Sequence, residues 1–85
     1  MSIRILYFAR LREDMGIAQE MFEPSAEVSD VKSLRAQLLA RGGASASAFA
    51  QGKAVRASVN QDIARDDTPV KAGDEVAFFP PVTGG

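Results

Sequence analysis

A single amphipathic helix among several short apolar segments is the feature of this 85-residue sequence that most restricts its fold. Ser29 is a favourable N-cap residue, Asp30 puts a negative charge in the first turn, and Gly42-Gly43 ends the segment. Apolar residues recur at helical spacing at Val31, Leu34 and Leu38. One helix can cover only one face of a small sheet, so the rest of the chain must supply that sheet.

The other apolar segments predict strands, because they are rich in β-branched and aromatic residues and are bounded by turn residues. The predicted strands are residues 3–8, 19–23 and 54–59, a short piece beginning at Ile63, and residues 75–79. We expect a loop or short turn at residues 10–17 and a loop at residues 44–51, with Phe49 packed into the core; a short helical turn is the alternative in the second segment. This order predicts an α+β fold of the β-grasp type, with a mixed sheet of four to five strands and one main helix on one face.

Length and charge place limits on the kind of protein. Eighty-five residues suit one domain, which we assign to residues 1–81, followed by a flexible C-terminal Gly-Gly tail at 82–85. The net charge is -1 and the basic residues are scattered, which argues against nucleic acid as a partner. Arg4 and Arg10 interrupt the N-terminal apolar segment, so we predict neither a signal peptide nor a membrane span, and a cytoplasmic location.

The chain contains no cysteine and no histidine, which excludes most self-contained active sites. Thiolate nucleophiles, disulfides, Ser-His-Asp triads and nearly all zinc sites need one of these residues, so we expect no metal site. Adjacent acidic residues occur at Glu13-Asp14, Asp66-Asp67 and Asp74-Glu75, and all three pairs are predicted to be solvated turns. The chain is therefore not expected to be catalytic alone.

The last six residues are Pro80-Pro81-Val82-Thr83-Gly84-Gly85. Glycine has no Cβ and can lie extended in a narrow channel where any side chain would clash. Behind a stiff Pro-Pro spacer, such a tail suits insertion of the Gly85 carboxylate into the active site of another protein. A frayed terminus without function is the alternative.

The chain resembles the ubiquitin-like sulfur carriers, and most closely their molybdopterin synthase branch. The matching segments are residues 5–9, Arg12-Glu13 with Gly16, the predicted helix, residues 59–61 and residues 73–85. Terminal Gly-Gly is shared by all ubiquitin-like carriers and modifiers. The preceding Gly73-Asp74-Glu75-Val76-Ala77-Phe78-Phe79-Pro80-Pro81-Val82 is characteristic of the molybdopterin branch.

The resemblance implies a cycle in which Gly85 carries sulfur. An E1-like adenylyltransferase would activate the carboxylate of Gly85 with ATP and Mg²⁺, which are bound by that partner rather than by this chain. A sulfur donor would leave a thiocarboxylate, and Gly84 would let the tail enter the large subunit of molybdopterin synthase. There the sulfur would pass to cyclic pyranopterin monophosphate to form a dithiolene. A heterotetramer of two large and two small subunits is implied.

Alternation along the first and last strands also predicts a partner-binding surface. Leu6, Phe8 and Phe79 are expected on the side of the sheet away from the helix, as one exposed apolar patch. The resemblance implies contacts of Phe8, Ile63 and Phe79 with the large subunit, with Arg12 near the same surface. Tail contacts are implied for Pro80, Pro81, Val82 and Thr83. A second small core beneath a loop is the alternative for the aromatic residues.

Three other functions remain open from the sequence. The chain could deliver sulfur for thiamine, cysteine or tRNA thiolation, because those carriers also end in Gly-Gly. It could be a ubiquitin-like modifier joined to lysines, because one acyl-adenylate can lead to either fate. It could also be an interaction domain with an inert tail, in which case loss of Gly85 would not matter.

Overall fold

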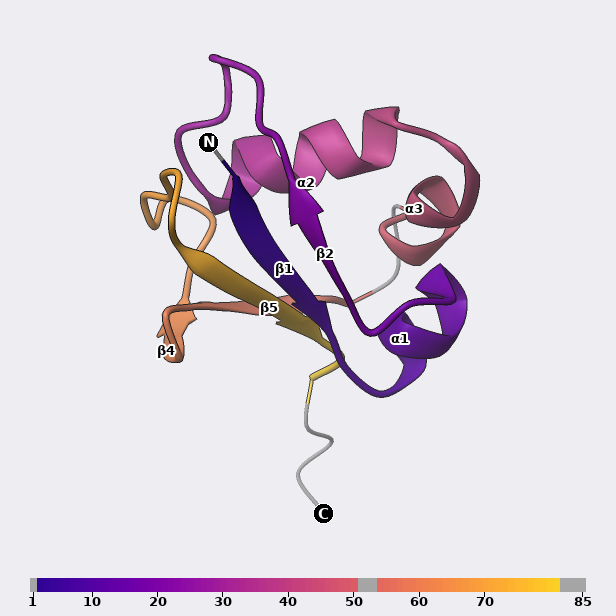
Figure 1. Cartoon of the computed structure of the whole chain (residues 1–85). Helices are drawn as coiled ribbons and strands as arrows, with labels where there is room; N and C mark the ends of the chain where they lie inside the picture. The colour runs from indigo at the N-terminus through magenta and orange to yellow at the C-terminus, as the bar shows by residue number, and fades with distance from the viewer. Residues whose placement is uncertain (1, 51–53, 82–85) are drawn as a thin grey trace.

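The computed structural model describes residues 2–50 and 54–81, which form one mixed sheet with three helices beside it (Figure 1). The elements in chain order are β1 (Ile3–Tyr7), α1 (Arg10–Met15), β2 (Gln19–Phe22), α2 (Val31–Ala40), α3 (Gly43–Ala48), β3 (Arg56–Val59), β4 (Asp62–Ala64) and β5 (Glu75–Phe79). All five predicted strands are present, within two residues of their expected bounds. The predicted tail, residues 82–85, lies outside the described residues.

The strand order is β2-β1-β5-β3-β4, so the last strand of the chain occupies the centre of the sheet. β5 runs parallel to β1 and antiparallel to β3, while β2 and β4 form the two edges. Because β1 and β5 are parallel, both end at the same end of the sheet. This mixed sheet with one main helix on one face confirms the predicted β-grasp architecture.

Helix α2 begins one residue later than the sequence suggested, because Asp30 rather than Ser29 is the N-cap. The Asp30 carboxylate accepts a hydrogen bond from the Ser33 amide at 2.8 Å, and the Ser33 hydroxyl accepts one from the Asp30 amide at 3.1 Å. This reciprocal pair is a capping box, in which serine takes the place of the usual glutamate or glutamine. The predicted stripe is buried: Val31, Leu34 and Leu38 are all fully inaccessible.

The loops predicted at residues 10–17 and 44–51 were wrong, because each contains a short helix. In α1 the buried residues are Leu11 and Met15, whose i, i+4 spacing makes one apolar contact surface. Helix α3, which was only the alternative expectation, packs Ala48 into the core, and Phe49 follows it. Both helices are held by tertiary packing, since segments this short are not stable in isolation.

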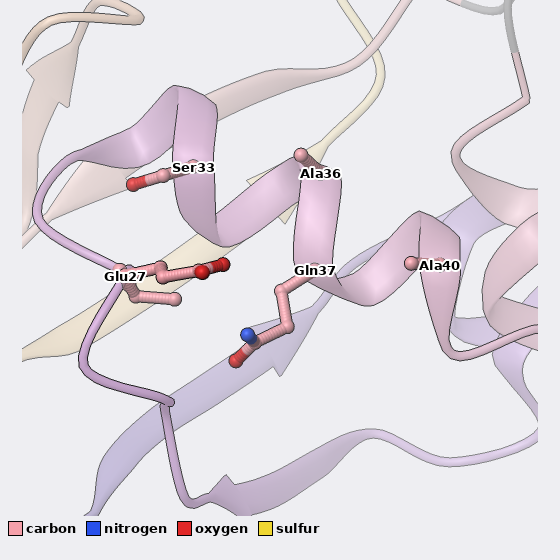
Figure 2. A pocket seen from close by; sticks show the side chains of 6 residues that line it. Glu27, Ser33, Ala36, Gln37 and Ala40 are labelled. Carbon is pink, nitrogen blue, oxygen red and sulfur yellow. The ribbon is translucent and has the colours of Figure 1, made fainter.

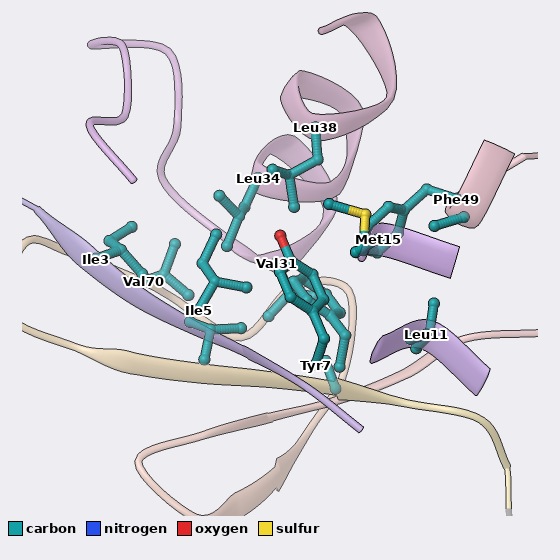
Figure 3. Packing of buried hydrophobic residues seen from close by; sticks show 14 of the residues in the cluster. Ile3, Ile5, Tyr7, Leu11, Met15, Val31, Leu34, Leu38, Phe49 and Val70 are labelled. Carbon is teal, nitrogen blue, oxygen red and sulfur yellow. The ribbon is translucent and has the colours of Figure 1, made fainter. Parts of the chain in front are cut away.

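The face of the sheet toward the helices, called here the inner face, carries the hydrophobic core (Figure 3). Its strand residues are Ile3, Ile5, Tyr7, Ala57, Val59, Val76 and Phe78. Tyr7, Phe49 and Phe78 form a cluster of three rings, in which Phe49 and Phe78 meet edge to face with centroids 4.9 Å apart. The expected packing of Phe49 in the core is therefore confirmed, and Val76 and Phe78 are fully buried there.

The predicted solvated turn at Asp74-Glu75 was also wrong, because the Asp74 side chain is buried. Its carboxylate accepts hydrogen bonds from the Asn60 side chain at 3.1 Å and from the Lys71 amide at 2.9 Å. The Asn60 side-chain oxygen in turn accepts the Glu75 amide at 3.0 Å. Asp74 thus fastens the β3–β4 turn to the start of β5, which is a structural role.

Candidate functional site

The segment that leads into the C-terminal tail begins at the end of the central strand. We define Phe79, Pro80 and Pro81 as the tail root; all three are half-buried. Neither proline has an amide hydrogen to extend the ladder, so β5 stops at Phe79. Val82, Thr83, Gly84 and Gly85, for which function was predicted, lie outside the described residues. The structure therefore places the root of the tail and the surface around it.

Phe8 lies beside the tail root. It follows β1 directly, and its amide donates a hydrogen bond to the Phe78 carbonyl at 3.1 Å, which continues the β1–β5 ladder. Because Tyr7 is in register with Phe78, Phe8 is level with Phe79. The chain then turns sharply at Ala9, which has a positive φ of 53°. Two aromatic side chains thus flank the point where the tail begins.

The side of the sheet opposite the helices, called here the outer face, is largely uncovered. Helices α1, α2 and α3 all send their buried side chains into the inner core, and no other described element packs over the outer face. Its strand residues are Gln19, Met21, Arg4, Leu6, Glu75, Ala77, Phe79, Arg56, Ser58 and Ile63. Phe8 is 48% exposed and Ile63 is 74% exposed.

A connected line of outer-face residues, apolar except for Ser58, crosses four strands. Leu6 is in register with Ala77, Ala77 with Ser58, and Ser58 with Ile63. The expected patch of Leu6, Phe8 and Phe79 is present, but only Phe8 of the three is strongly exposed; Leu6 and Phe79 are half-buried. The sheet thus brings together the three predicted partner-binding residues Phe8, Ile63 and Phe79 on one face.

The charged residues at this end of the sheet belong mainly to α1. Arg12 is exposed and makes no side-chain hydrogen bond or ion pair with the described residues. Arg10 is held by Asp14, with a distance of 3.0 Å between the guanidinium and the carboxylate. Of the two, Arg12 is therefore the one whose guanidinium is not engaged by a described residue, and its contact with a partner stays a prediction.

One polar cluster lies on the inner side, where Tyr7, Glu20 and Arg41 meet. The Tyr7 hydroxyl donates to the Glu20 carboxylate at 2.6 Å, and Arg41 donates two hydrogen bonds to the same carboxylate at 2.8 and 3.0 Å. Burial, together with the hydrogen bond to Glu20, raises the pKa of Tyr7 far above its ordinary value. The hydrogen bonds from Arg41 lower the pKa of Glu20. A neutral tyrosine and an ionised glutamate, each already bonded, serve the fold rather than acid-base chemistry.

The hollow beside α2 offers no second site. The hollow in Figure 2, of about 370 Å³, lies between α2 and the segment before it. Gln37, which points into it, already donates to the Ser25 hydroxyl at 2.6 Å and accepts from the Ser25 amide at 3.0 Å. The remaining lining includes Ala36 and Ala40, which bring no reactive group. This hollow therefore lacks the convergent polar groups of a ligand site.

Residues 2–50 and 54–81 contain neither a metal site of acidic, cysteine or histidine side chains nor a membrane-spanning helix. No group of three acidic, cysteine or histidine side chains in these ranges is arranged to hold a metal ion. No helix in the described part of the chain is long and apolar enough to cross a membrane. The outer face around the tail root remains the candidate functional site.

The family model described as the ThiS family matches residues 5–85, which is nearly the whole chain. The chain belongs to the ThiS family. A relative from Escherichia coli (strain K12), a molybdopterin synthase sulfur carrier subunit, is 43% identical over 83 residues, covering 98% of this chain and 99% of the relative. The family assignment therefore includes the tail residues that the structure does not describe.

Two solved structures share the fold of this ThiS-family chain. One is the complex of subunits 1 and 2 of molybdopterin-converting factor from Helicobacter pylori 26695, with a TM-score of 0.64, 23% identity and full coverage of both chains. The other is the small archaeal modifier protein 1 of H. volcanii, with a TM-score of 0.74 and 21% identity, covering 95% of this chain and 98% of that one. At these identities the likeness shows the fold alone.

Arg56 is an outer-face residue of this ThiS-family chain that was not predicted to belong to the site. It is in register with Phe79 across the β3–β5 pair, and the two side chains lie on the same face. The signal available in the sequence was its alternation with Ala57, which placed it on the side away from the core. Its position beside the tail root depends on the strand pairing, which alternation alone does not give.

Proposed function

We propose that this chain is the sulfur-carrier subunit of a molybdopterin synthase, with Gly85 as the residue that carries the sulfur. The observation that carries the proposal is the 43% identity to a molybdopterin synthase sulfur carrier subunit over nearly the full length of both chains. The Gly-Gly terminus of the sequence and the position of its root at the end of the central strand are consistent with it.

The chemistry takes place at the terminal carboxylate, which is a poor electrophile until it is activated. In the proposed cycle an E1-like adenylyltransferase, which binds ATP and Mg²⁺, joins AMP to Gly85 and releases pyrophosphate. A sulfide equivalent from a donor then attacks the acyl carbon, displaces AMP and leaves a thiocarboxylate. Because the sulfur is carried by the backbone terminus, the carrier needs neither cysteine nor histidine, and the sequence has neither.

The sulfur leaves the carrier at the large subunit. The thiocarboxylate sulfur forms a bond to a carbon of cyclic pyranopterin monophosphate as the bond from that carbon to its oxygen substituent breaks, and water then cleaves the acyl–sulfur bond and restores the Gly85 carboxylate. Two such transfers complete the dithiolene. In this proposal Gly84, Val82 and Thr83 occupy the channel of the large subunit, and Pro80 and Pro81 hold the channel-bound residues away from the sheet.

The outer face is the proposed docking surface for the large subunit. Phe8, Ile63 and Phe79 lie on one uncovered side of the sheet, and exposed apolar groups that gather in this way often mark interfaces. Arg12, in the helix that follows Phe8 in the chain, is exposed and has no partner among the described residues. Subunits 1 and 2 of the H. pylori molybdopterin-converting factor form a complex, which supports a second subunit as the partner.

Intact mass spectrometry tests the carrier chemistry directly. The chain is incubated with an E1-like adenylyltransferase, ATP, Mg²⁺ and a sulfur source; the control is a variant that lacks Gly85. We expect exchange of one oxygen for sulfur at Gly85 in the full chain and no exchange in the control. Addition of the large subunit and cyclic pyranopterin monophosphate should restore the original mass.

The competing functions give different results in the same experiment. Conjugates joined to lysines of other proteins, without free thiocarboxylate, would favour a ubiquitin-like modifier. Thiocarboxylate that forms but is not consumed by the large subunit and the pterin would favour a carrier for another pathway. A chain that stays unmodified with an adenylyltransferase active on another carrier would contradict the carrier proposal.

A further inference from the structure

Arg56 lies among the apolar residues of the outer face although it carries a full charge. It stands directly opposite Phe79 on the neighbouring strand, where paired side chains have Cβ atoms about 4.5–5.5 Å apart. Two residues further along β3, Ser58 is paired with Ile63. The guanidinium therefore belongs to the surface that Phe8, Phe79 and Ile63 present to a partner.

Among residues 2–50 and 54–81, Arg56 has no ion-pair or side-chain hydrogen-bond partner. Five of the seven arginines form an ion pair, with these partners: Arg4 with Glu75, Arg10 with Asp14, Arg35 with Asp66, Arg41 with Glu20, and Arg65 with Asp67. Arg12 and Arg56 are the exceptions among the described residues. Of these two, only Arg56 is on a strand of the sheet itself, next to the tail root.

A partner that covers the outer face would therefore also remove water from the charged guanidinium of Arg56. An apolar partner surface would remove water from the guanidinium and offer no hydrogen bond in return, which is strongly unfavourable. A carboxylate opposite the guanidinium replaces that water, and the planar group can donate two parallel hydrogen bonds to it. Partners without an acidic residue at this point are disfavoured.

We infer that Arg56 is a specificity-determining residue of the outer face, and that the large subunit places an aspartate or glutamate side chain against its guanidinium. The inference rests on the proposed function, because it takes the large subunit as the occupant of this face. It adds a requirement of charge and position to a surface that otherwise selects partners by apolar contact.

The test measures the dissociation constant of the full chain with its cognate large subunit at low and at high salt. Arg56→Gln removes the charge and should weaken binding on the order of 30-fold, which corresponds to about 2 kcal/mol for a buried charge left without its partner. Arg56→Glu should weaken binding further, and Arg56→Lys should restore only part of the affinity. The wild-type affinity should fall more steeply with salt than that of Arg56→Gln.

Arg65→Gln is the matched control, because it removes the same charge close to the adjacent strand but outside the sheet. Arg65 directly follows β4; its side chain is 87% exposed and its ion pair with Asp67, at 3.8 Å, lies in solvent. We expect its affinity to stay within about twofold of wild type, since exposed pairs contribute little. Thermal unfolding of each variant verifies that the fold is intact.

A second experiment identifies the acidic residue. Acidic side chains of the large subunit are replaced one at a time by arginine, and one of these changes should restore the binding of Arg56→Glu. Equal affinity of wild type and Arg56→Gln would overturn the inference while leaving the carrier proposal intact. A wild-type chain that acquires no thiocarboxylate and does not bind the large subunit would overturn the proposed function, and the inference with it.

Discussion

The two faces of the sheet are made from the same five strands but differ in how far their side chains are buried. On the inner face the residues are almost completely inaccessible and meet α2 and the two short helices. On the outer face Phe8, Met21 and Ile63 are between 48% and 74% exposed, and Arg56 forms no ion pair with any residue that the structure describes. Stability is thus concentrated on one face, which leaves the composition of the other free to serve recognition.

Phe78 and Phe79 are the sharpest comparison, because they are adjacent, identical in side chain and on opposite faces. Phe78→Ala should lower the free energy of unfolding by about 3–5 kcal/mol, since it leaves a cavity in the three-ring cluster. That is a large part of the roughly 5–15 kcal/mol typical of a domain. Urea unfolding measures the loss. A loss below about 1 kcal/mol would mean that the inner face is not the source of stability.

Phe79→Ala should have a small effect on stability and a clear effect on binding. We expect a loss of unfolding free energy below about 1.5 kcal/mol, because the ring is only half-buried, but a loss of about 1–2 kcal/mol in binding to the large subunit. Isothermal titration calorimetry measures the binding, and urea unfolding of the same sample measures the stability. Ala36→Ser, on the exposed side of α2, is a control that should change neither. Unchanged binding by Phe79→Ala would remove this residue from the interface.

The smallest expected effect concerns the polar cluster of Tyr7, Glu20 and Arg41 on the inner side of the sheet. The raised pKa of Tyr7 means that its neutral form is favoured in the fold, so this contribution to stability is full below the ordinary tyrosine pKa of about 10 and is lost as the pH rises above it. Tyr7 is the only tyrosine and tryptophan is absent, so ultraviolet absorbance reports on this group alone. Tyrosinate should appear only well above pH 10 and together with unfolding.

The cluster of Tyr7, Glu20 and Arg41 also predicts that the stability of the fold falls at acidic pH. The lowered pKa of Glu20 means that its contribution to stability is present above the ordinary glutamate pKa of about 4.3 and is lost as the pH falls through the lower folded value. Glu20→Gln should therefore flatten the acid limb of stability against pH. A tyrosinate signal near pH 10 in folded protein would contradict the arrangement of Tyr7 and Glu20.

Much of the fold could be predicted because the relevant signals are local and periodic. Alternation along residues 3–8 and 75–79 separated inner from outer residues correctly, and the spacing of Val31, Leu34 and Leu38 located α2. The short helices escaped prediction for a physical reason. Helix α1 offers only Leu11 and Met15 as a pattern, and α3 consists of alternating small residues without an apolar stripe.

The candidate site was predictable only in part, because it is assembled across strands. Phe8 and Phe79 followed from alternation, whereas Ile63 came from the resemblance, since three residues of strand give little pattern. Asp74 was misjudged because its burial depends on Asn60, which is fourteen residues away in the chain. Arg56 was missed because its proximity to Phe79 is a matter of strand register. Contacts of this kind cannot be predicted from the residue pattern of any one segment.

The central position of β5 also affects how the protein folds. β5 follows the other four strands in the sequence but must enter between β1 and β3, so the sheet is not complete until residues 75–79 have left the ribosome. Pairings between such distant segments form late in folding. Until then the row of Phe8, Phe79 and Arg56 does not exist. An enzyme that recognises this row before it acts on the terminus would thereby select finished chains and ignore truncated or unfolded ones.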